Sequence, residues 1–440
     1  MSAGVLRSYR VAPVAHIGGS VTVPGDKSIS HRALLLGAIS EGNTHISGFL
    51  DSADCRATLD ALRALGVRIE QPAARQLVVH GVGPTGLRPS AAPLDMGNAG
   101  TAMRLFMGLL CGQEFASTLV GDASLMNRPM ERVARPLRLM GALIDTQDDR
   151  PPVKLHGHAP LHGIDYVLPM ASAQVKSAIL LATLRARGVT RITEPAPTRD
   201  HTERMLVQLG ATLTRRGAAV ELEGGQRLRG TVIAVPGDFS SAAFFIVAGC
   251  LAAADGLTVR DVGINPTRTG LLDALRLMGA QITVTPNADV RAEPCADVRV
   301  RASALKGAVI PPALVPLAID ELPALFIAAA CAEGETLITG AGELRVKESD
   351  RLAAMAAGLR ALGARCELLP DGIRIQGGTL RGGRIACLGD HRVAMSFAVA
   401  SVRASGPIVI DDVENVGTSF PGFVAAARSV GLRVEEGAAP

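Results

Sequence analysis

One pattern of polar and apolar positions recurs along the chain. An amphipathic segment ends at a glycine and is followed by a segment in which polar and apolar residues alternate. The pattern predicts a helix capped by glycine and followed by a strand. The glycines are Gly66, Gly141, Gly210, Gly279, Gly363 and, in a weaker copy, Gly431. Their spacing of about 70 residues is too long for a solenoid and indicates a small α/β unit used six times.

Each unit also contains an earlier segment that is apolar on nearly every face. The segments are residues 28–39, 100–110, 172–184, 240–253, 321–332 and 391–402. Helices of this kind lie inside a protein. We therefore expect one buried helix, one amphipathic helix and connecting strands in each unit. Three units would form a domain with parallel inner helices under a sheet, and six would form two similar domains.

Composition narrows the class of protein. A chain of 440 residues exceeds one hydrophobic core, and 48% hydrophobic with 20% charged residues is typical of a folded globular protein. The absence of Trp and the presence of only two Tyr argue against nucleic-acid binding by base stacking. A net charge of +4 with scattered Lys and Arg favours local clusters for a small anion.

The seven cysteines show no Cys-x-x-Cys pair and no His at zinc spacing. We interpret them as reduced core thiols of a cytoplasmic protein. The first residues lack the apolar core of a signal peptide, and the most apolar segments are too short to span a bilayer. The sequence thus predicts a soluble protein with no membrane partner and no metal.

Lys27 and Arg32 stand at the front of the first buried segment, in "VPGDKSISHRALLLG". The fourth unit repeats the turn and the serines as "VPGDFSSAAFF", without Lys or Arg. The scaffold therefore does not require these cations, and we assign them to a ligand. The alternative is a surface ion pair without function.

Polar residues gather at the starts of the other helices as well. The clusters contain Ser28, Asn98, Gly100, Thr101, Arg104, Arg128, Ser172, Gln174, Lys176, Arg199, Asp200, His201, Asp320, Glu321, Arg345, Lys347, Glu348, Asp350, Arg351, Asp390, His391 and Arg392. Helix N-termini favour anions, and added Lys and Arg predict a cleft for a ligand with several negative charges. Each signal alone is also explained by ordinary capping.

Two acids suggest catalysis in addition to binding. Asp320 precedes a buried segment, and Glu348 lies between Lys347 and Arg351, which we place on the first turn of a helix. Carboxylates among cations stay ionised and can accept a proton. The alternatives are an N-cap for Asp320 and a helical ion pair for Glu348. No phosphate loop or dinucleotide fingerprint is present, so a nucleotide is not implied.

Several motifs resemble one family closely. "PGDKSISHRALLL", "GNAGTAMRL", "GDASLMNRPM", "MASAQVKSAILLA", "TRDHTER", "RVKESDRL" and "GDHRVAMS" are similar to those of the 5-enolpyruvylshikimate-3-phosphate synthases. The match runs in order over almost the whole chain. Its wording is most similar to the bacterial subgroup that includes glyphosate-tolerant enzymes.

The resemblance implies two similar α/β domains, each of three βαβαββ units with parallel inner helices, and an active site in the interdomain cleft. Residues 22–236 would form the domain with the main shikimate 3-phosphate site. Residues 1–21 and 237–440 would supply Asp320, Glu348 and the arginines for phosphoenolpyruvate. The implied reaction moves the enolpyruvyl group to the 5-hydroxyl of shikimate 3-phosphate, releases phosphate and uses no cofactor. A monomer is expected.

The resemblance also implies roles for single residues. Lys27 would meet both substrates, Asp320 would accept the hydroxyl proton, and Glu348, with Lys27, would protonate the methylene carbon. Shikimate 3-phosphate would be bound by Lys27, Ser28, Arg32, Ser172, Ala173, Gln174, Arg199, Asp320 and Lys347. Phosphoenolpyruvate would be bound by Asn98, Gly100, Arg128, Arg351 and Arg392.

Two positions depart from common family patterns, and a third bears on inhibition. Ala173 follows Ser172 where many members have a second serine, and Thr418 stands where many have a Lys. Gly100 stands where tolerant relatives have Ala, whose methyl group crowds glyphosate, so we expect inhibition by glyphosate.

Two alternatives stay open. A related enolpyruvyl transferase acts on a UDP-amino sugar, but it typically uses a Cys in a mobile loop and lacks the "DKSISHR" phosphate site. A non-catalytic anion-binding relative would be expected to lack Asp320, Glu348 or Lys27, and this chain has all three.

Overall fold

The computed structural model describes residues 7–288 and 292–438. Their contacts divide the chain into two compact units. Unit 2 is Gly25–Val235 together with a short segment ending at Glu293. Unit 1 contains the described residues up to Pro24, from Pro236 to residue 288, and from Pro294 onward. Each unit has its own hydrophobic cluster of buried side chains.

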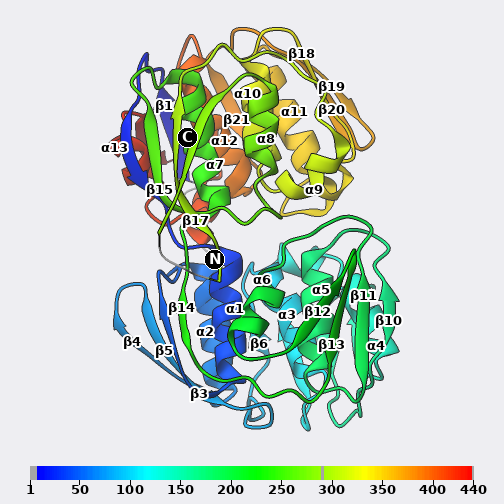
Figure 1. Cartoon of the computed structure of the whole chain (residues 1–440). Helices are drawn as coiled ribbons and strands as arrows, with labels where there is room; N and C mark the ends of the chain where they lie inside the picture. The colour runs from blue at the N-terminus through cyan, green and yellow to red at the C-terminus, as the bar shows by residue number, and fades with distance from the viewer. Residues whose placement is uncertain (1–6, 289–291, 439–440) are drawn as a thin grey trace. The chain divides into compact units, whose positions relative to one another are not determined.

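The buried helices that the sequence predicts are present in both units (Figure 1). They are α1 (Lys27–Ala38), α3 (Gly100–Leu110), α5 (Ala173–Thr183), α7 (Phe239–Ala252), α10 (Leu322–Ala330) and α12 (His391–Ala400). Within unit 2, α3 packs against α1 and α5, and within unit 1, α7, α10 and α12 pack against one another. All fourteen residues of α7 are buried. The all-round apolar pattern is therefore explained by position at the centre of each unit.

A second set of helices covers the buried ones. These are α2 (Ala53–Ala64), α4 (Glu131–Leu139), α6 (His201–Gln208), α8 (Gly270–Leu277), α11 (Arg351–Ala361) and α13 (Phe423–Ser429), with the short α9 (Val315–Ala318). Single 3-10 turns are η1 (Leu125–Asn127), η2 (Pro312–Leu314), η3 (Gly342–Val346), η4 (Ser401–Arg403) and η5 (Glu414–Thr418).

The six predicted glycines end these covering helices. Their φ angles are 86° for Gly66, 102° for Gly141, 95° for Gly210, 92° for Gly279, 84° for Gly363 and 103° for Gly431. Only glycine adopts this left-handed conformation without steric cost, so it turns the chain from each helix into the next strand. The sixfold repeat is confirmed.

Unit 2 contains three four-stranded sheets. Their strand orders are β14 (Val232–Ala234), β3 (Glu41–Ser47), β5 (Gln76–Val82), β4 (Arg68–Ala73); β6 (Leu94–Asp95), β7 (Ser117–Val120), β9 (Arg150–Leu155), β8 (Ile144–Gln147); and β10 (Asp165–Val167), β11 (Val189–Thr193), β13 (Ala219–Glu223), β12 (Leu213–Arg216). In each, the first pair is parallel and the following pairs are antiparallel.

Unit 1 repeats this arrangement. Its strand orders are β2 (Gly19–Thr22), β15 (Leu257–Gly263), β17 (Cys295–Arg301), β16 (Gln281–Pro286); β18 (Glu335–Ile338), β20 (Gly372–Gln376), β19 (Arg365–Leu369); and β21 (Gly383–Ala386), β22 (Ile408–Asp411), β1 (Arg7–Ala12), β23 (Arg433–Ala438). In the three-stranded sheet, isolated parallel bridges from Lys306 and Val309 replace a fourth strand. Each repeat thus has its own small sheet, where the sequence suggested one sheet per domain.

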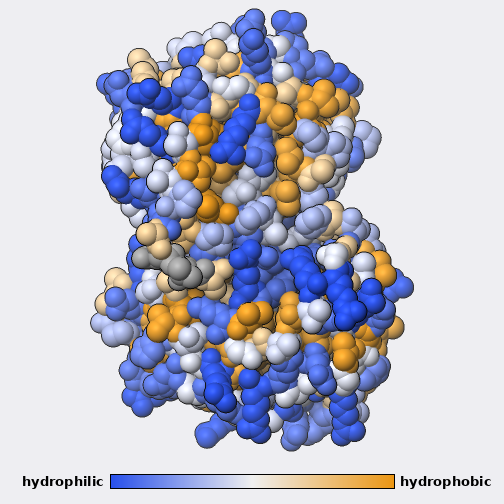
Figure 2. Space-filling model, in the orientation of Figure 1, coloured by the Kyte–Doolittle hydropathy of each residue, from blue (hydrophilic) through white to orange (hydrophobic). Residues whose placement is uncertain are grey.

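Exposed apolar side chains are scattered over the surface. Figure 2 shows orange residues in separate groups among blue ones on the face in view. Leu139, Leu143, Val167 and Val309 are examples of exposed apolar residues, a normal feature of globular proteins. No helix in the described ranges has both the length and the apolar character needed to cross a bilayer.

Candidate active site

The N-terminus of α1 brings Lys27 to a carboxylate. Asp26 is the N-cap residue, and its side chain accepts a hydrogen bond of 2.8 Å from the backbone N–H of Ile29. Lys27 Nζ donates to Asp54 Oδ2 at 2.9 Å, and both side chains are largely buried. Asp54 lies in the first turn of α2, whose N-cap residue is Ser52. The ion pair with Asp54 therefore fixes the ammonium group of Lys27 at the N-terminus of α1.

Arg32 lies one turn further along α1 and connects three helices. Its guanidinium donates to Thr202 Oγ1 at 2.7 Å and to Ser177 Oγ at 2.8 Å. It also donates to the backbone oxygen of Ser28 at 2.9 Å. Burial lowers the pKa of Arg32 to about 10, with a smaller contribution from the nearby Arg199, while Glu203 and Asp26 oppose the change. The side chain still carries its charge at neutral pH, which suits it to bind an anion.

A second group of cations surrounds the start of α3. Arg128 donates to Asn98 Oδ1 at 2.6 Å, and Asn98 Nδ2 donates to Asp122 Oδ2 at 2.7 Å. A Cβ atom at Gly100 would lie 3.1 Å from Arg128 Nη1 and 3.3 Å from Arg104 Nη1. Gly100 therefore allows two guanidinium groups to approach the helix end closely.

The start of α5 joins this group. Ser172 caps the helix by accepting from the backbone N–H of Val175 at 3.4 Å, and Ala173 is its first residue. Gln174 accepts from Arg104 Nη1 at 2.7 Å and donates to Thr101 Oγ1 at 2.9 Å. The side chain of Gln174 thus connects α5 to α3.

Lys176 differs from its neighbours in the predicted cluster. Its ammonium group lies 3.0 Å from Glu194 and 2.6 Å from Glu203, and its side chain is fully buried. A buried cation between two carboxylates holds the fold together. The interpretation of Lys176 as part of an anion-binding cluster is wrong, because its charge is already compensated.

In unit 1, Arg351 is the centre of a charged group. It is the first residue of α11 and is almost fully buried. It contacts Asp390 Oδ2 at 2.8 Å, Asp320 Oδ1 at 3.4 Å and the carboxylate of Glu348. Burial would lower the pKa of Arg351, but Asp390, Glu348 and Asp320 outweigh burial and raise it. Arg351 thus stays charged and fixes three carboxylates.

Two further cations contact Asp320 in the same group. Lys347 Nζ lies 3.7 Å from Asp320 Oδ1, and Arg392 Nη1 donates to the backbone oxygen of Asp320 at 3.0 Å. Arg392 lies on the first turn of α12, where Asp390 is the N-cap residue. Of the residues predicted in this half of the chain, Asp320, Lys347, Glu348, Arg351 and Arg392 come together.

The placement of Glu348 on a helical turn is wrong. The helix α11 begins at Arg351 with Asp350 as its N-cap residue, so Glu348 lies in the segment between η3 and α11. Asp350 accepts a hydrogen bond from the backbone N–H of Ala353, so the helix begins directly after it. Glu321, and not Asp320, occupies the N-cap position of α10. Asp320 is therefore not a capping residue.

Sequence reasoning missed the polar partners of the predicted cations. Asp54, Ser177 and Thr202 belong to amphipathic or buried segments, and their contacts with α1 depend on packing between helices. Arg268 was also missed. It reaches the start of α7 from a loop, at the turn where the sequence showed no cation.

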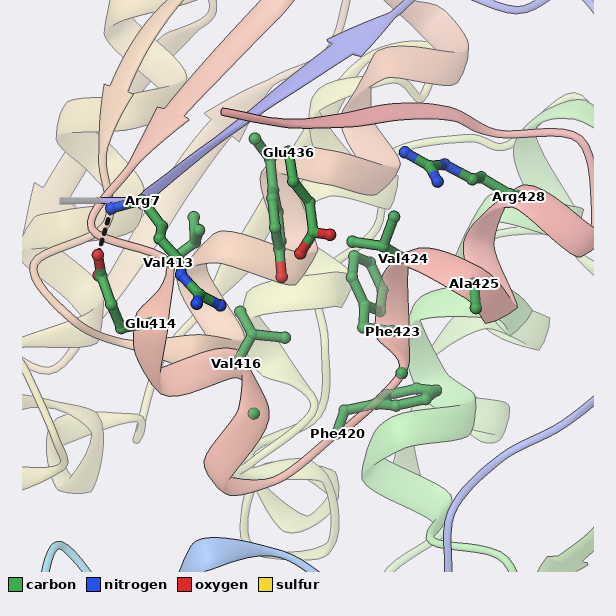
Figure 3. A pocket seen from close by; sticks show the side chains of 13 residues that line it. Arg7, Val413, Glu414, Val416, Phe420, Phe423, Val424, Ala425, Arg428 and Glu436 are labelled. Atoms are coloured by element: carbon green, nitrogen blue, oxygen red, sulfur yellow. Dashed lines mark hydrogen bonds between the residues drawn. The ribbon is translucent and has the colours of Figure 1, made fainter. Parts of the chain in front are cut away.

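Thr418, the residue in place of a family Lys, forms a local contact. It is the last residue of η5, and its hydroxyl donates to the backbone oxygen of Asn415 at 2.7 Å. A pocket of about 380 Å³ in unit 1 is lined by other residues of this segment (Figure 3). Phe420 and Phe423 point into it, with Arg7, Arg428 and Glu436 around it. None of the predicted site residues lines this pocket.

Each unit thus carries predicted residues at helix starts, those of α1, α3 and α5 in unit 2 and those of α11 and α12 in unit 1. The described residues contain no group of three or more His, Cys, Asp or Glu placed to hold a metal ion. The predicted residues combine several arginines and lysines with carboxylates that can exchange protons. This fold and chemistry define an α/β enzyme that acts on small molecules with several negative charges.

Comparison with known proteins supports this class. The family model of EPSP synthase (3-phosphoshikimate 1-carboxyvinyltransferase) matches residues 11–426. The 3-phosphoshikimate 1-carboxyvinyltransferase of Halorhodospira halophila is 59% identical over 430 residues, covering 97% of each chain. That of Acidithiobacillus ferrooxidans is 58% identical over 427 residues, covering 97% of this chain and 98% of the relative.

Solved structures agree with the sequence comparison. EPSP synthase from Acinetobacter baumannii matches with a TM-score of 0.88 at 51% identity, over 98% of this chain and 100% of that chain. The chain therefore belongs to the EPSP synthase family. It is a transferase of the shikimate pathway, which supplies aromatic amino acids.

Proposed function

We propose that the chain transfers the enolpyruvyl group of phosphoenolpyruvate to the 5-hydroxyl of shikimate 3-phosphate, with the two groups of residues acting on one pair of substrates. The observation that carries this proposal is the position of Asp320. Its carboxylate lies 3.4 Å from Arg351 and 3.7 Å from Lys347. A carboxylate among cations is ionised and can take a proton from a hydroxyl group.

The reaction would proceed by addition and elimination. Asp320 takes the proton of the 5-hydroxyl group. At the same time, the oxygen of that hydroxyl group forms a bond to C2 of phosphoenolpyruvate. Glu348, assisted by Lys27, delivers a proton to C3, so that C2 becomes tetrahedral. C3 then loses a proton, the double bond re-forms, and the bond from C2 to the phosphate oxygen breaks to release phosphate. The proton lost from C3 returns to Glu348, the leaving phosphate takes up the proton held by Asp320, and no cofactor takes part.

Charge complementarity supports the assignment of the binding residues. Lys27, Ser28, Arg32, Ser172, Ala173, Gln174, Arg199 and Lys347 would bind shikimate 3-phosphate. Asn98, Gly100, Arg128, Arg351 and Arg392 would bind phosphoenolpyruvate. Arg32 is held in place by two hydroxyl groups and Arg128 by Asn98, so little conformational entropy is lost when an anion binds. Residues 22–236 would thus provide most of the first substrate's site.

Phosphate release from the two substrates tests the proposal. Asp320→Asn and Lys27→Met should each lower kcat by about a hundredfold or more, because each removes a charged contact made in the transition state. Asp60→Asn, on an exposed side chain of α2, is the matched control and should keep the wild-type rate. Wild-type turnover in Asp320→Asn would overturn the assigned role of Asp320.

The same assay separates the two alternatives. Phosphate release with a UDP-amino sugar, and none with shikimate 3-phosphate, would support the related transferase. Binding of shikimate 3-phosphate without phosphate release in the wild type would support a non-catalytic protein. Deuterium incorporation at C3 of phosphoenolpyruvate from heavy water should disappear in Glu348→Gln if Glu348 supplies that proton.

Gly100 also bears on inhibition by glyphosate. We place the chain near the bacterial subgroup with tolerant members, but expect it to be sensitive. A methyl group at this position would lie 3.1 Å from Arg128, a cation proposed for phosphoenolpyruvate. Gly100→Ala should therefore raise the glyphosate concentration for half inhibition at least about tenfold, with a smaller rise in KM for phosphoenolpyruvate. Full wild-type turnover in millimolar glyphosate at low phosphoenolpyruvate would contradict this.

We further propose that the protein works as a monomer in the cytoplasm. Each unit buries its own apolar helices, which supports function without a partner subunit. Sedimentation at assay concentration should give a single species of 45.5 kDa. A stable dimer would contradict the monomer.

A further inference from the structure

The start of α7 has the sequence of the start of α1 without its cations. Pro236, Gly237 and Asp238 repeat the turn, and Phe239 stands where α1 has Lys27. Asp238 caps α7 by accepting from the backbone N–H of Ser240 at 2.8 Å. The helix end is thus capped by a carboxylate in the same way as α1, where Asp26 accepts from Ile29.

Arg268 supplies the missing cation from another part of the chain. It comes from the loop before α8 and is almost fully buried. Its Nη2 atom lies 3.0 Å from Asp238 Oδ1 and 2.8 Å from Ser240 Oγ. A serine hydroxyl, an arginine and a helix N-terminus are together the elements of an anion site.

The anion at this place is a carboxylate of the protein itself. Glu321, the N-cap residue of α10, accepts a hydrogen bond from Ser240 Oγ, and its Oε1 atom lies 3.7 Å from Arg268 Nη2. The side chain is fully buried. At the start of α1, the proposed function places an anion of the substrate. At the start of α7, a carboxylate of the protein occupies the corresponding position.

Glu321 directly follows Asp320, whose Cα atom is only about 3.8 Å away across one peptide bond. The ion pairs of Asp320 with Arg351 and Lys347, at 3.4 and 3.7 Å, exceed the usual length of a strong hydrogen bond. Because the two residues are adjacent, a fixed backbone at Glu321 adds to the constraint that these ion pairs, and the hydrogen bond from Arg392 to the Asp320 backbone, place on the direction of the Asp320 side chain.

We propose that Glu321, Ser240 and Arg268 are positioning residues for the proton acceptor Asp320. This inference rests on the proposed function, since it assumes the role of Asp320. The buried carboxylate of Glu321 acts as an internal anion that ties the segment before α10 to the start of α7. Loss of this tie should misplace Asp320 and lower kcat while substrate binding is retained.

Chemical rescue distinguishes positioning from simple support of the fold. Glu321→Ala should lower kcat by about tenfold or more. The KM values of both substrates should stay within about twofold of the wild type, since none of the three residues is assigned to substrate binding. Added formate should bind between Ser240 and Arg268 and restore part of kcat in a saturable way, whereas chloride at the same ionic strength should not.

A matched variant and a milder one complete the experiment. Glu335→Ala removes an exposed carboxylate of unit 1 and should show neither loss nor rescue. Ser240→Ala removes one hydroxyl group and should lower kcat less than Glu321→Ala does, without rescue by formate. If Glu321→Ala does not fold, Ser240→Ala becomes the test of the positioning role. Its kcat would then have to fall at unchanged KM, and an unchanged kcat would overturn the inference.

The outcomes separate this inference from the proposed function. If Asp320→Asn is inactive while Glu321→Ala keeps its kcat, or loses it without rescue by formate, the positioning role is overturned. If Asp320→Asn turns over normally, the proposed role of Asp320 itself fails.

Discussion

The turns before α1 and α7 show how one sequence motif serves two purposes. Both contain Pro-Gly-Asp, and in both the aspartate accepts a backbone hydrogen bond of 2.8 Å. At the next position α1 has Lys27, paired with Asp54, whereas α7 has Phe239, which is fully buried. The backbone of the turn is therefore independent of the side chains that follow it.

The two helix starts differ in the source of the anion that each one binds. At α1, Lys27 and Arg32 provide positive charge for an outside anion under the proposed function. At α7, the buried guanidinium of Arg268 lies between two carboxylates of the protein itself, 3.0 Å from Asp238 and 3.7 Å from Glu321. The same turn and helix start can thus serve as a binding site in one copy and as an internal ion-pair contact in another. A few substitutions and one arginine from a distant segment make the difference.

The largest expected effect is on stability and concerns the start of α7, the copy of the motif without Lys27 and Arg32. Phe244 occupies in α7 the position that Arg32 occupies in α1, and it is buried. Phe244→Ala should lower the free energy of unfolding by about 3–5 kcal/mol, because it leaves a cavity in a close-packed core. Urea denaturation measures the loss, and the KM for shikimate 3-phosphate should not change. A loss below about 1 kcal/mol would mean that the two copies do not differ in this way.

The corresponding change at the start of α1, the copy with Lys27 and Arg32, should affect the binding of shikimate 3-phosphate instead. Arg32→Met should raise the KM for shikimate 3-phosphate by about a hundredfold, since a charged contact with phosphate contributes about 3 kcal/mol. Steady-state kinetics measures the change. Thr202 and Ser177 can still bond to each other at 2.8 Å, which limits the cost to folding. An unchanged KM together with a large loss of stability would assign Arg32 to the fold alone.

The pH dependence of stability should also differ between the copies. Burial, followed by Lys27 and Arg32, lowers the pKa of His31 to about 3, and Ala243 stands at the corresponding position of α7. The unfolded chain therefore binds a proton below its ordinary pKa of 6.5, whereas the folded protein does not until pH is near 3. Stability must fall as pH falls through this window.

His31→Gln removes this titration. Between pH 6.5 and 5, the variant should lose about 2 kcal/mol less unfolding free energy than the wild type. Urea denaturation at several pH values gives the two slopes. Parallel slopes would show that His31 is protonated in the folded protein.

The smallest expected effect concerns the two capping aspartates. Asp26→Asn keeps a good N-cap and should cost less than about 1 kcal/mol. Asp238→Asn also weakens the contact with the buried Arg268 and should cost about 1 kcal/mol more. Thermal unfolding of the two variants gives the difference, and equal values would contradict a structural role for the Arg268 contact.

The features predicted from the sequence are those determined locally. A glycine at φ near 90° and a helix that is apolar on every face leave clear patterns, so the repeats and the buried helices could be found. Lys27 stood out because the copy in the fourth unit lacks it.

The features that could not be predicted depend on packing between distant segments. Arg268 reaches Ser240 across 28 residues from a loop without periodicity. The exact start of α11 depends on the capping hydrogen bond of Asp350, so Glu348 was placed one turn too far into the helix. The compensated charge of Lys176 could not be inferred, because Glu194 and Glu203 lie in other elements.

The position of β1 has a consequence for the order of events during synthesis. This first strand lies between β22 and β23, and Arg10 is paired with Val409 on one side and Glu435 on the other. Its sheet cannot be completed until β23 has left the ribosome. Unit 2, whose main segment ends at Val235, can fold while translation continues. A nascent chain stalled before β22 and β23 should therefore contain a protease-resistant unit 2, while the segment that contains β1 is still digestible.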